Sequence, residues 1–310
     1  MSGLSLSFAS THSAPRKRGV AANRDGNAGQ PSQVSWFLDQ FLPNVGPQSD
    51  MQDVCGLELI SSWEARFSEI YMPGLREAFD VETTTRLTNL LEEFPLSSVA
   101  TFAAIVHDVG HSSGPNACLP GLPIYARKMP IRWYGAMGEL TTDLAALALL
   151  SDVTPFLSPF ILLFRLFDYI REGFAIDPTY SWLNKDYDSL AAALLFQNLL
   201  TSGVLSRTSK GWHLELDRIQ ELSYQFLVEL HDLGNNLVEL VKAGQAKQVK
   251  PTTAEYFSRF LERNKKGRFL LPDSHRAFLE QVAHLPLKPS GDAMGKYYKF
   301  QHLLQVEKWQ

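Results

Sequence analysis

Cysteine is scarce in this chain, because among 310 residues only Cys55 and Cys118 are cysteines. Two cysteines cannot build the disulfide framework of a small secreted protein, and no Cys/His spacing typical of a zinc site is present. The cysteine content therefore indicates a reducing compartment, and we expect an intracellular, cytoplasmic protein.

Long hydrophobic runs are also missing. The longest apolar stretch, between Asp152 and Arg165, contains Pro155 and Pro159 and is too short and interrupted for a transmembrane segment. The G-x-G-x-x-G, G-x-S-x-G and H-E-x-x-H signatures are absent as well, so no common nucleotide, hydrolase or metallopeptidase motif identifies the function. What remains is an ordinary globular composition, 45% hydrophobic and 20% charged.

The charge is small overall but unevenly distributed. The net charge is −4, yet residues 1–38 carry four basic residues and one acidic residue, and residues 242–310 carry 13 basic and six acidic residues. Residues 39–241 carry 12 basic and 26 acidic residues. Basic ends favour contact with an anionic partner such as RNA or DNA. The alternative is that the basic C-terminal part packs or oligomerises against the acidic middle.

The sequence divides into three parts. Residues 1–35 are rich in Gly, Ser, Asn and Gln and predict a flexible, disordered basic arm, or alternatively a transit peptide. Residues 36–245 predict an acidic helical body. Residues 246–310 predict a basic helical segment packed on that body.

Apolar residues recur at helical spacing through most of the body. We therefore predict a mainly α protein, an irregular helical bundle. The first predicted helix spans 53–71, and Pro73-Gly74 is expected to end it. Further helices are predicted at 82–94, 97–106, 136–151, 155–172, 187–202, 252–264, 275–285 and 293–308.

Two segments have clearer patterns. Residues 203–216 alternate apolar and polar side chains around a polar turn, which predicts one short β-hairpin. The next segment, up to Val241, has apolar residues at steps of three and four, beginning at Ile219. A pattern of this length favours a helix of a globular bundle over a coiled coil.

One motif suggests chemistry. The segment from Phe102 through His107, Asp108 and His111 resembles the metal-binding helix of HD-domain phosphohydrolases. The resemblance implies a Mn²⁺ or Mg²⁺ site with His107, Asp108 and His111 as ligands and with Asp108 and His111 in catalysis. That family needs an earlier histidine, and none lies between His12 and His107. The alternative is that these side chains cap a helix end. We therefore expect no metal, cofactor or catalytic residue, with the HD site as the alternative.

Basic and aromatic residues are interleaved near the C-terminus, a pairing that can hold single-stranded nucleic acid. Phe257 and Phe260 have the helical spacing of core residues, so the candidates for nucleic-acid contact are those in the polar turn and the arm. They are Arg16, Lys17, Arg18, Arg24, Lys265, Lys266 and Arg268.

A basic arm on a helical body is similar in layout to small viral coat or nucleocapsid proteins such as those of partitiviruses. That layout implies a structural protein that assembles with itself, contacts RNA through its ends and is found in the virion. The HD phosphohydrolase is one alternative function, and a host-targeted or regulatory binding module is another.

Overall fold

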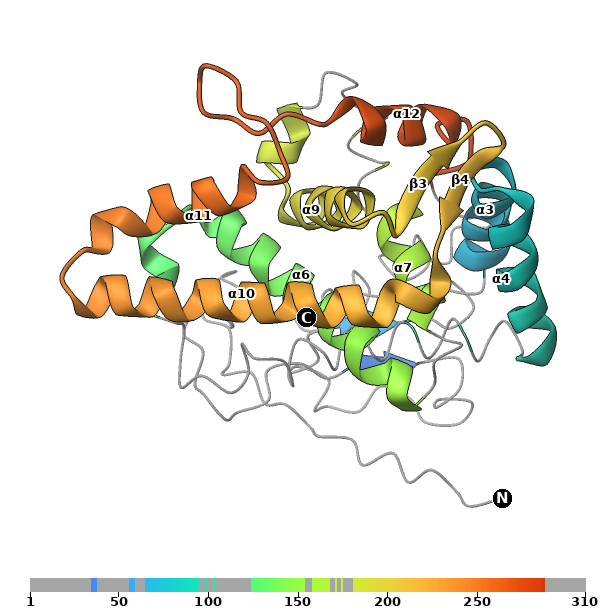
Figure 1. The fold of residues 1–310 in the computed structure, drawn as a ribbon, viewed down its shortest axis with the longest axis horizontal. Helices are drawn as coiled ribbons and strands as arrows, with labels where there is room; N and C mark the ends of the chain where they lie inside the picture. The colour runs from blue at the N-terminus through green and yellow to red at the C-terminus, as the bar shows by residue number, and fades with distance from the viewer. Residues whose placement is uncertain are drawn as a thin grey trace, which may run out of the picture.

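A computed structural model describes residues 35–37, 56–58, 65–94, 99, 103, 124–153, 158–167, 171, 174 and 181–287. Most of these residues are helical, so the predicted mainly α class is confirmed (Figure 1). The helices are α3 (Met72–Ala78), α4 (Val81–Glu93), α6 (Ile131–Val153), α7 (Ser158–Phe167), α9 (Tyr187–Thr201), α10 (Ile219–Lys242), α11 (Val249–Phe257) and α12 (Asp273–Gln281).

Short strands complete the described elements. β1 (Ser35–Phe37) pairs in parallel with β2 (Gly56–Glu58). β3 (Leu205–Thr208) and β4 (Gly211–Leu214) form an antiparallel pair, which confirms the hairpin expected at 203–216.

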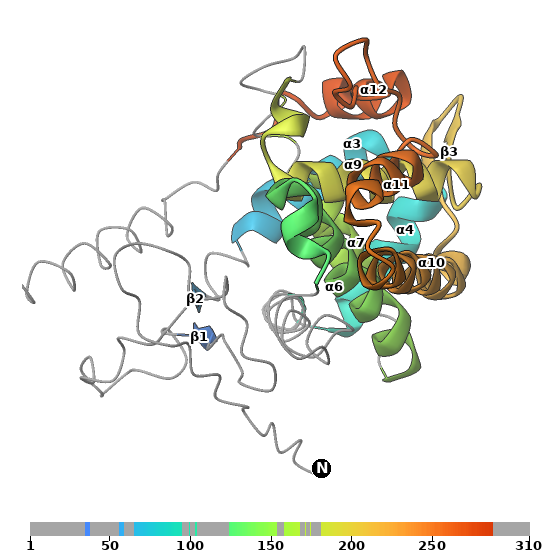
Figure 2. The ribbon, with the colours of Figure 1, turned by 90° about the vertical axis from the view of Figure 1, so that its left-hand side faces the viewer.

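The centre of the molecule is built from α6, α7 and α9. Every residue of α7 is buried, and in α9 the residues from Ser189 to Leu199 are buried. A helix that is apolar on all sides is stable only when other elements surround it. Seen nearly along the axis of α10, α9 lies between α10 on one side and α12 on the other, and α6 runs beside α10 (Figure 2).

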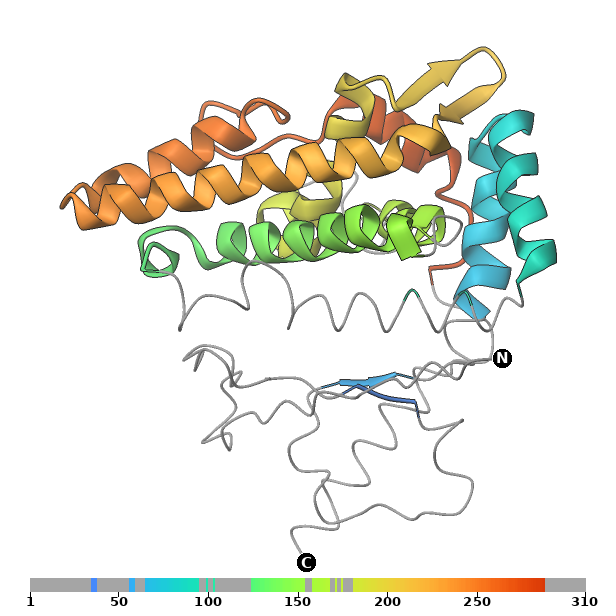
Figure 3. The ribbon, with the colours of Figure 1, turned by 60° about the horizontal axis from the view of Figure 1, so that its bottom comes forward.

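α10 is the long amphipathic helix that the sequence predicts. Its buried apolar residues follow the predicted spacing, and they are Ile219, Phe226, Leu230, Leu233 and Leu237. This face lies alongside α6, and the two helices run next to each other along the length of the molecule (Figure 3). The opposite face is exposed and includes Tyr224, which is 59% exposed.

Phe278 of α12 joins elements that are far apart in sequence. Its ring lies 6.0 Å from that of Phe79, 5.5 Å from Phe167, 5.4 Å from Phe196 and 5.7 Å from Trp212, centroid to centroid. These rings follow α3 or belong to α7, α9 and β4. Aromatic pairs at such distances add to the free energy of burial. One core therefore holds α12 against the body.

The expected helix at 53–71 is wrong at both ends. Gly56–Glu58 form a strand, and the helical residues that start at Ala65 continue through Pro73 and Gly74 to Ala78. Pro73 is the second residue of α3 and directly follows the π-helical turn Phe67–Tyr71, so the hydrogen-bond pattern of the helix changes where proline lacks its N–H. A Cβ on Gly74 would lie 2.6 Å from the Phe167 ring, so glycine here allows α7 to pack closely. Pro73-Gly74 is thus compatible with a helix that continues.

Other predictions fall partly outside the described residues. Residues 1–34, which make up nearly all of the expected arm, and residues 288–310 lie outside them. In the predicted helix at 97–106, Val99 and Ala103 are described, and both are helical and buried. Among the described helices, none is both long and apolar enough to cross a membrane.

Candidate functional site

A buried arginine gathers three carboxylates at the centre of the fold. The side chain of Arg165, in α7, is 1% exposed, and its Nη2 lies 3.3 Å from Oε2 of Glu139. Its Nε pairs with Oδ2 of Asp143, and its Nη1 lies 3.3 Å from Oδ1 of Asp188. Glu139 and Asp143 are one turn apart on α6, and Asp188 is in the first turn of α9. We call these four residues the Arg165 cluster.

Burial makes this cluster electrostatically unusual. Removing charges from water is energetically unfavourable. For a buried guanidinium this penalty is offset best when several of its N–H groups pair with carboxylates. Burial and the nearby charge of Glu139 raise the pKa of Asp188 to about 7, against the charge and hydrogen bond of Arg165, which lower it. The cluster thus combines a fixed cation with a carboxyl group that can hold a proton near neutral pH.

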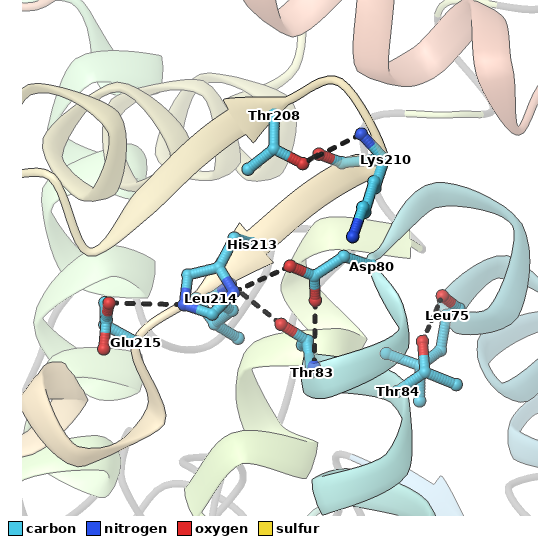
Figure 4. Close-up of polar contacts among 10 residues, drawn as sticks. Leu75, Asp80, Thr83, Thr84, Thr208, Lys210, His213, Leu214 and Glu215 are labelled. Atoms are coloured by element: carbon cyan, nitrogen blue, oxygen red, sulfur yellow. Dashed lines mark hydrogen bonds and ion pairs between the residues drawn. The ribbon is translucent and has the colours of Figure 1, made fainter.

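A second polar group joins the hairpin to α4 (Figure 4). Nδ1 of His213, in β4, lies 2.8 Å from Oδ2 of Asp80, and its Nε2 lies 3.2 Å from Oε1 of Glu215. Asp80 is the N-cap of α4 and accepts a hydrogen bond from the Thr83 N–H at 2.9 Å. The Thr83 hydroxyl accepts one from the Leu214 N–H at 3.0 Å. We call Asp80, His213 and Glu215 the His213 clamp.

Hydrogen bonds and nearby charges shift the pKa values of His213 and Asp80. Burial lowers the pKa of His213, but the hydrogen bonds and charges of Asp80 and Glu215 outweigh this effect and raise it. Burial likewise raises the pKa of Asp80, but the hydrogen bonds from Thr83 and His213 outweigh it and lower it. Both ring nitrogens of His213 contact carboxylates. The clamp is therefore an ion-paired connection between β4 and α4.

The residues proposed from the HD motif lie outside the described residues. This applies to His107, Asp108 and His111, and also to the arm residues Arg16, Lys17, Arg18 and Arg24. Among the residues that the structure does describe, no group of three or more His, Cys, Asp or Glu side chains could hold a metal ion. A metal site would therefore need residues outside the described ranges.

The basic turn is present and exposed. Lys265, Lys266 and Arg268 are exposed as predicted, and Oδ1 of Asn264 accepts hydrogen bonds from the N–H groups of Lys266 and Arg268. Phe257 is fully buried, which agrees with its interpretation as a core residue. These three cations remain a predicted contact surface, since exposure alone identifies no partner.

A second His-Asp pair, His231-Asp232, lies on the exposed face of α10. Nδ1 of His231 lies 3.1 Å from Nδ2 of Asn235, one turn further along the helix. In the described part of the chain, this pair belongs to no group of three or more His, Cys, Asp or Glu side chains that could hold a metal ion.

Sequence reasoning missed the Arg165 cluster. Asp186 and Asp188 lie at the start of α9, where carboxylates commonly stabilise a helix N-terminus. The Asp186 side chain does so by accepting from the Ser189 N–H, whereas Asp188 pairs with Arg165. The available signal was the spacing of Glu139 and Asp143, four residues apart in an otherwise apolar segment, together with Arg165 at the end of an apolar run. Acidic residues one turn apart on a buried helix need a cation.

Comparison with protein-family models and with curated proteins gives no match. Among solved structures, the chain is similar to dipeptidyl-peptidase III from Corallococcus sp. strain EGB, with a TM-score of 0.50 and 14% identity over 79% of this chain and 42% of that one. DPP III from Caldithrix abyssi has a TM-score of 0.48 and 14% identity, over 79% of this chain and 43% of that one. The chain thus spans less than half the length of either structure.

This likeness corrects the functional hypothesis drawn from the sequence. The coat or nucleocapsid interpretation is contradicted, because the Corallococcus structure, whose fold the chain resembles over 79% of its residues, is that of a peptidase. The layout argument failed because basic ends on a helical body are compatible with many folds. Neither the phosphohydrolase nor the regulatory-module alternative gains support from the comparisons. At 14% identity the likeness shows the fold alone.

Proposed function

We propose that this chain is a metal-dependent peptidase whose metal ligands are His107, His111 and Glu139, with Asp108 as the general base. The observation that carries the proposal is the order His107-Asp108-Val109-Gly110-His111 in a chain with a peptidase-like fold. Metallopeptidases use two histidines four residues apart with an acidic residue after the first, in the pattern H-E-x-x-H. Here aspartate takes the position of glutamate.

The donor set fits a divalent metal such as zinc. Catalytic zinc sites commonly use two histidines and one glutamate, and leave a position for water. Glu139 is the only glutamate of the Arg165 cluster, so we choose it as the third ligand of a site with two histidines and one glutamate. Its side chain is 12% exposed and 3.3 Å from Arg165, whereas Asp143 is 1% exposed and pairs directly with the Nε of Arg165. Glu139 is therefore the more exposed of these two carboxylates.

Each residue of this proposed site would then have its own role in peptide hydrolysis. A bound divalent metal lowers the pKa of its water and polarises the peptide carbonyl. Asp108 would accept the proton of that water and return it to the leaving amine. Its side chain is one methylene shorter than the glutamate of the usual motif, so substrate and water must come closer to the backbone of Asp108. The imidazoles of His107 and His111 bind metal in the neutral form.

Metal content and peptide hydrolysis test the proposal together. Purified wild-type protein is expected to contain about one equivalent of zinc per chain by mass spectrometry and to cleave short peptides of a mixed library. We expect His107→Ala and Glu139→Ala to lose the metal, and Asp108→Asn to keep the metal but lose turnover.

The second His-Asp pair provides the matched control. His231→Ala changes the same residue type in a similar sequence and should keep both metal and activity. A wild-type protein that takes up no zinc contradicts the site. Metal that persists in His107→Ala also contradicts it, and metal binding without hydrolysis of any peptide contradicts the enzymatic role.

A further inference from the structure

Three segments that are distant in sequence meet where α6 begins. Nη1 of Arg132 donates to the carbonyl oxygen of Asn184 at 3.3 Å. The Asn184 side chain in turn donates to the carbonyl oxygen of Phe269 at 2.8 Å and accepts from the Phe269 N–H at 2.9 Å. The start of α6, the turn Ser181–Asn184 and the basic turn 264–268 are therefore neighbours, towards the end of the molecule opposite to the hairpin (Figure 1).

Large apolar side chains are exposed at this place. Ile131, the first residue of α6, is 60% exposed. A Cβ on Gly135, one turn further along α6, would lie 2.9 Å from Cγ of Tyr187, so the Tyr187 ring lies against the same face of α6 as Ile131. Tyr187 is 42% exposed, and Leu270, which follows Phe269, is 39% exposed. Apolar side chains that gather on one part of a surface commonly mark contact with a partner or a membrane.

The same surface is basic. Residues 131–132, 185–187 and 265–270 contain five basic residues, and their one acidic residue is Asp186. None of the five basic side chains forms an ion pair with a carboxylate in the described part of the chain. We call the exposed side chains of these three ranges the apolar-basic surface.

The carboxylates around this surface are mostly engaged elsewhere. Asp186 is the N-cap of α9 and accepts from the Ser189 N–H. Glu139 and Asp188 lie near Tyr187, but they belong to the Arg165 cluster and pair with its guanidinium. Glu262 is exposed beside the surface. The cations therefore outnumber the carboxylates that face solvent here.

We propose that the apolar-basic surface binds the anionic face of a lipid membrane as a peripheral contact. Ile131 and Leu270 enter the boundary between headgroups and acyl chains, where a tyrosine ring such as that of Tyr187 also fits. The lysines and arginines beside them are attracted to anionic headgroups such as phosphatidylserine. Stable anchoring to a membrane surface generally needs two such signals. The proposal is independent of the proposed metal site, because it uses only residues of this surface.

Single-stranded nucleic acid matches this surface less well. It is held by aromatic faces on which bases stack. The ring of Trp133 instead lies 6.0 Å from that of Phe257 and 5.5 Å from that of Phe269, and both phenylalanines are buried. Ile131 and Leu270 protrude, and aliphatic side chains suit acyl chains better than bases.

Co-sedimentation of the full chain with vesicles tests the proposal. We expect binding to phosphatidylcholine vesicles with about one third phosphatidylserine, little binding to phosphatidylcholine alone, and weaker binding as salt rises to about 1 M. Lys265→Glu combined with Lys266→Glu should lower the partition coefficient by about 10-fold or more. Ile131→Ser combined with Leu270→Ser should lower it by about 10-fold as well, because less apolar surface is then buried in the lipid.

Matched variants change the same kinds of residue elsewhere. Arg76→Glu combined with Lys210→Glu reverses two exposed charges on α3 and the hairpin, at the other end of the molecule (Figure 1). Val228→Ser removes an apolar side chain that is 41% exposed on α10. Both controls should bind the mixed vesicles as wild type does, and thermal unfolding should show that every variant is folded.

Several results would overturn the proposal. These are no binding to the mixed vesicles, equal binding to neutral vesicles, and equal binding by wild type and the surface variants. A loss in the lysine variant without a loss in the Ile131 and Leu270 variant would also overturn it, because attraction to any soluble polyanion would give that result. A wild-type chain that binds an oligouridine or a polyglutamate peptide but no vesicle would identify nucleic acid or an acidic peptide as the partner instead.

Discussion

Nδ1 of His213 lies 2.8 Å from Oδ2 of Asp80, a residue 133 positions earlier in the chain. The contact connects the second strand of the hairpin to the first turn of α4, and the Asp80 N–H donates to the carbonyl oxygen of Trp212 at 2.8 Å beside it. A local helix cap and a long-range ion pair thus share one carboxylate. Changes at either residue should affect both the helix and the hairpin.

The first prediction concerns the pH dependence of the clamp. The pKa of His213 is raised in the folded protein, so its contribution to stability is fully present below the unfolded pKa of about 6.5 and is lost as the pH rises through the folded value. His213→Gln removes this titration. The difference in free energy of unfolding between wild type and variant, from urea titrations between pH 5 and pH 9, should be largest at the acidic end. A difference that is constant with pH would show that the ion pairs contribute nothing.

The second prediction separates the cap from the ion pair. Asp80→Ala removes both, and the loss of the cap alone should lower the free energy of unfolding by about 1–2 kcal/mol. Asp80→Asn keeps an oxygen that can accept from the Thr83 N–H but removes the charge that pairs with His213. It should therefore cost less than Asp80→Ala in thermal unfolding at pH 6. Equal losses in the two variants would mean that the charge, and not the cap, carries the effect.

Helix periodicity made much of this fold predictable. α4, α9 and α10 lie close to where apolar spacing places them, because each has a repeating pattern over several turns. The prediction that a helix ends at Pro73-Gly74 was wrong. The effect of a proline depends on its position in the helix, and the effect of a glycine depends on its packing partner, which here is Phe167. Neither can be deduced from local sequence.

The candidate site was less predictable than the fold. Glu139, Arg165 and Asp188 belong to three helices, and no local pattern shows that they meet. The burial of a charged residue depends on tertiary partners, so Arg165 could be interpreted only as the end of an apolar run. His213 is similar, because alternation predicts its strand but not its contact with Asp80.

The third prediction concerns Gly211, at the start of β4. Its φ is +128°, and a Cβ there would lie 3.0 Å from the carbonyl oxygen of Ala78 and 3.0 Å from the carbonyl carbon of Phe79. Gly211→Ala should therefore lower the free energy of unfolding by about 2 kcal/mol, through backbone strain and the close contact. Gly203→Ala is the control, because its φ is +72° but nothing lies within 4 Å of its Cβ position. Similar losses in both variants would show that strain alone is responsible and that contact with α3 is not.

The last prediction concerns a histidine in the aromatic core. His275 of α12 is fully buried and stacks on Phe196, with centroids 3.9 Å apart and planes inclined by 5°. Neither ring nitrogen has a hydrogen-bond partner in the described part of the chain. Burial lowers its pKa to about 3. The ring is therefore neutral in the folded protein throughout the pH range in which an unfolded histidine takes up a proton.

Linkage gives the sign of the effect. The folded pKa of His275 lies below the unfolded value of about 6.5, so its neutral form supports the fold above that pH, and stability falls as the pH drops toward 3. His275→Phe keeps a ring against Phe196 and removes the titration, and His275→Gln removes the titration without the ring. Both variants should lose less stability than wild type between pH 7 and pH 4.5 in urea unfolding, by about 2 kcal/mol. His275→Phe should also be the more stable of the two at pH 7, because only it retains the stacked ring. If all three proteins lose the same stability on acidification, proton uptake by His275 does not limit the acid stability of this fold.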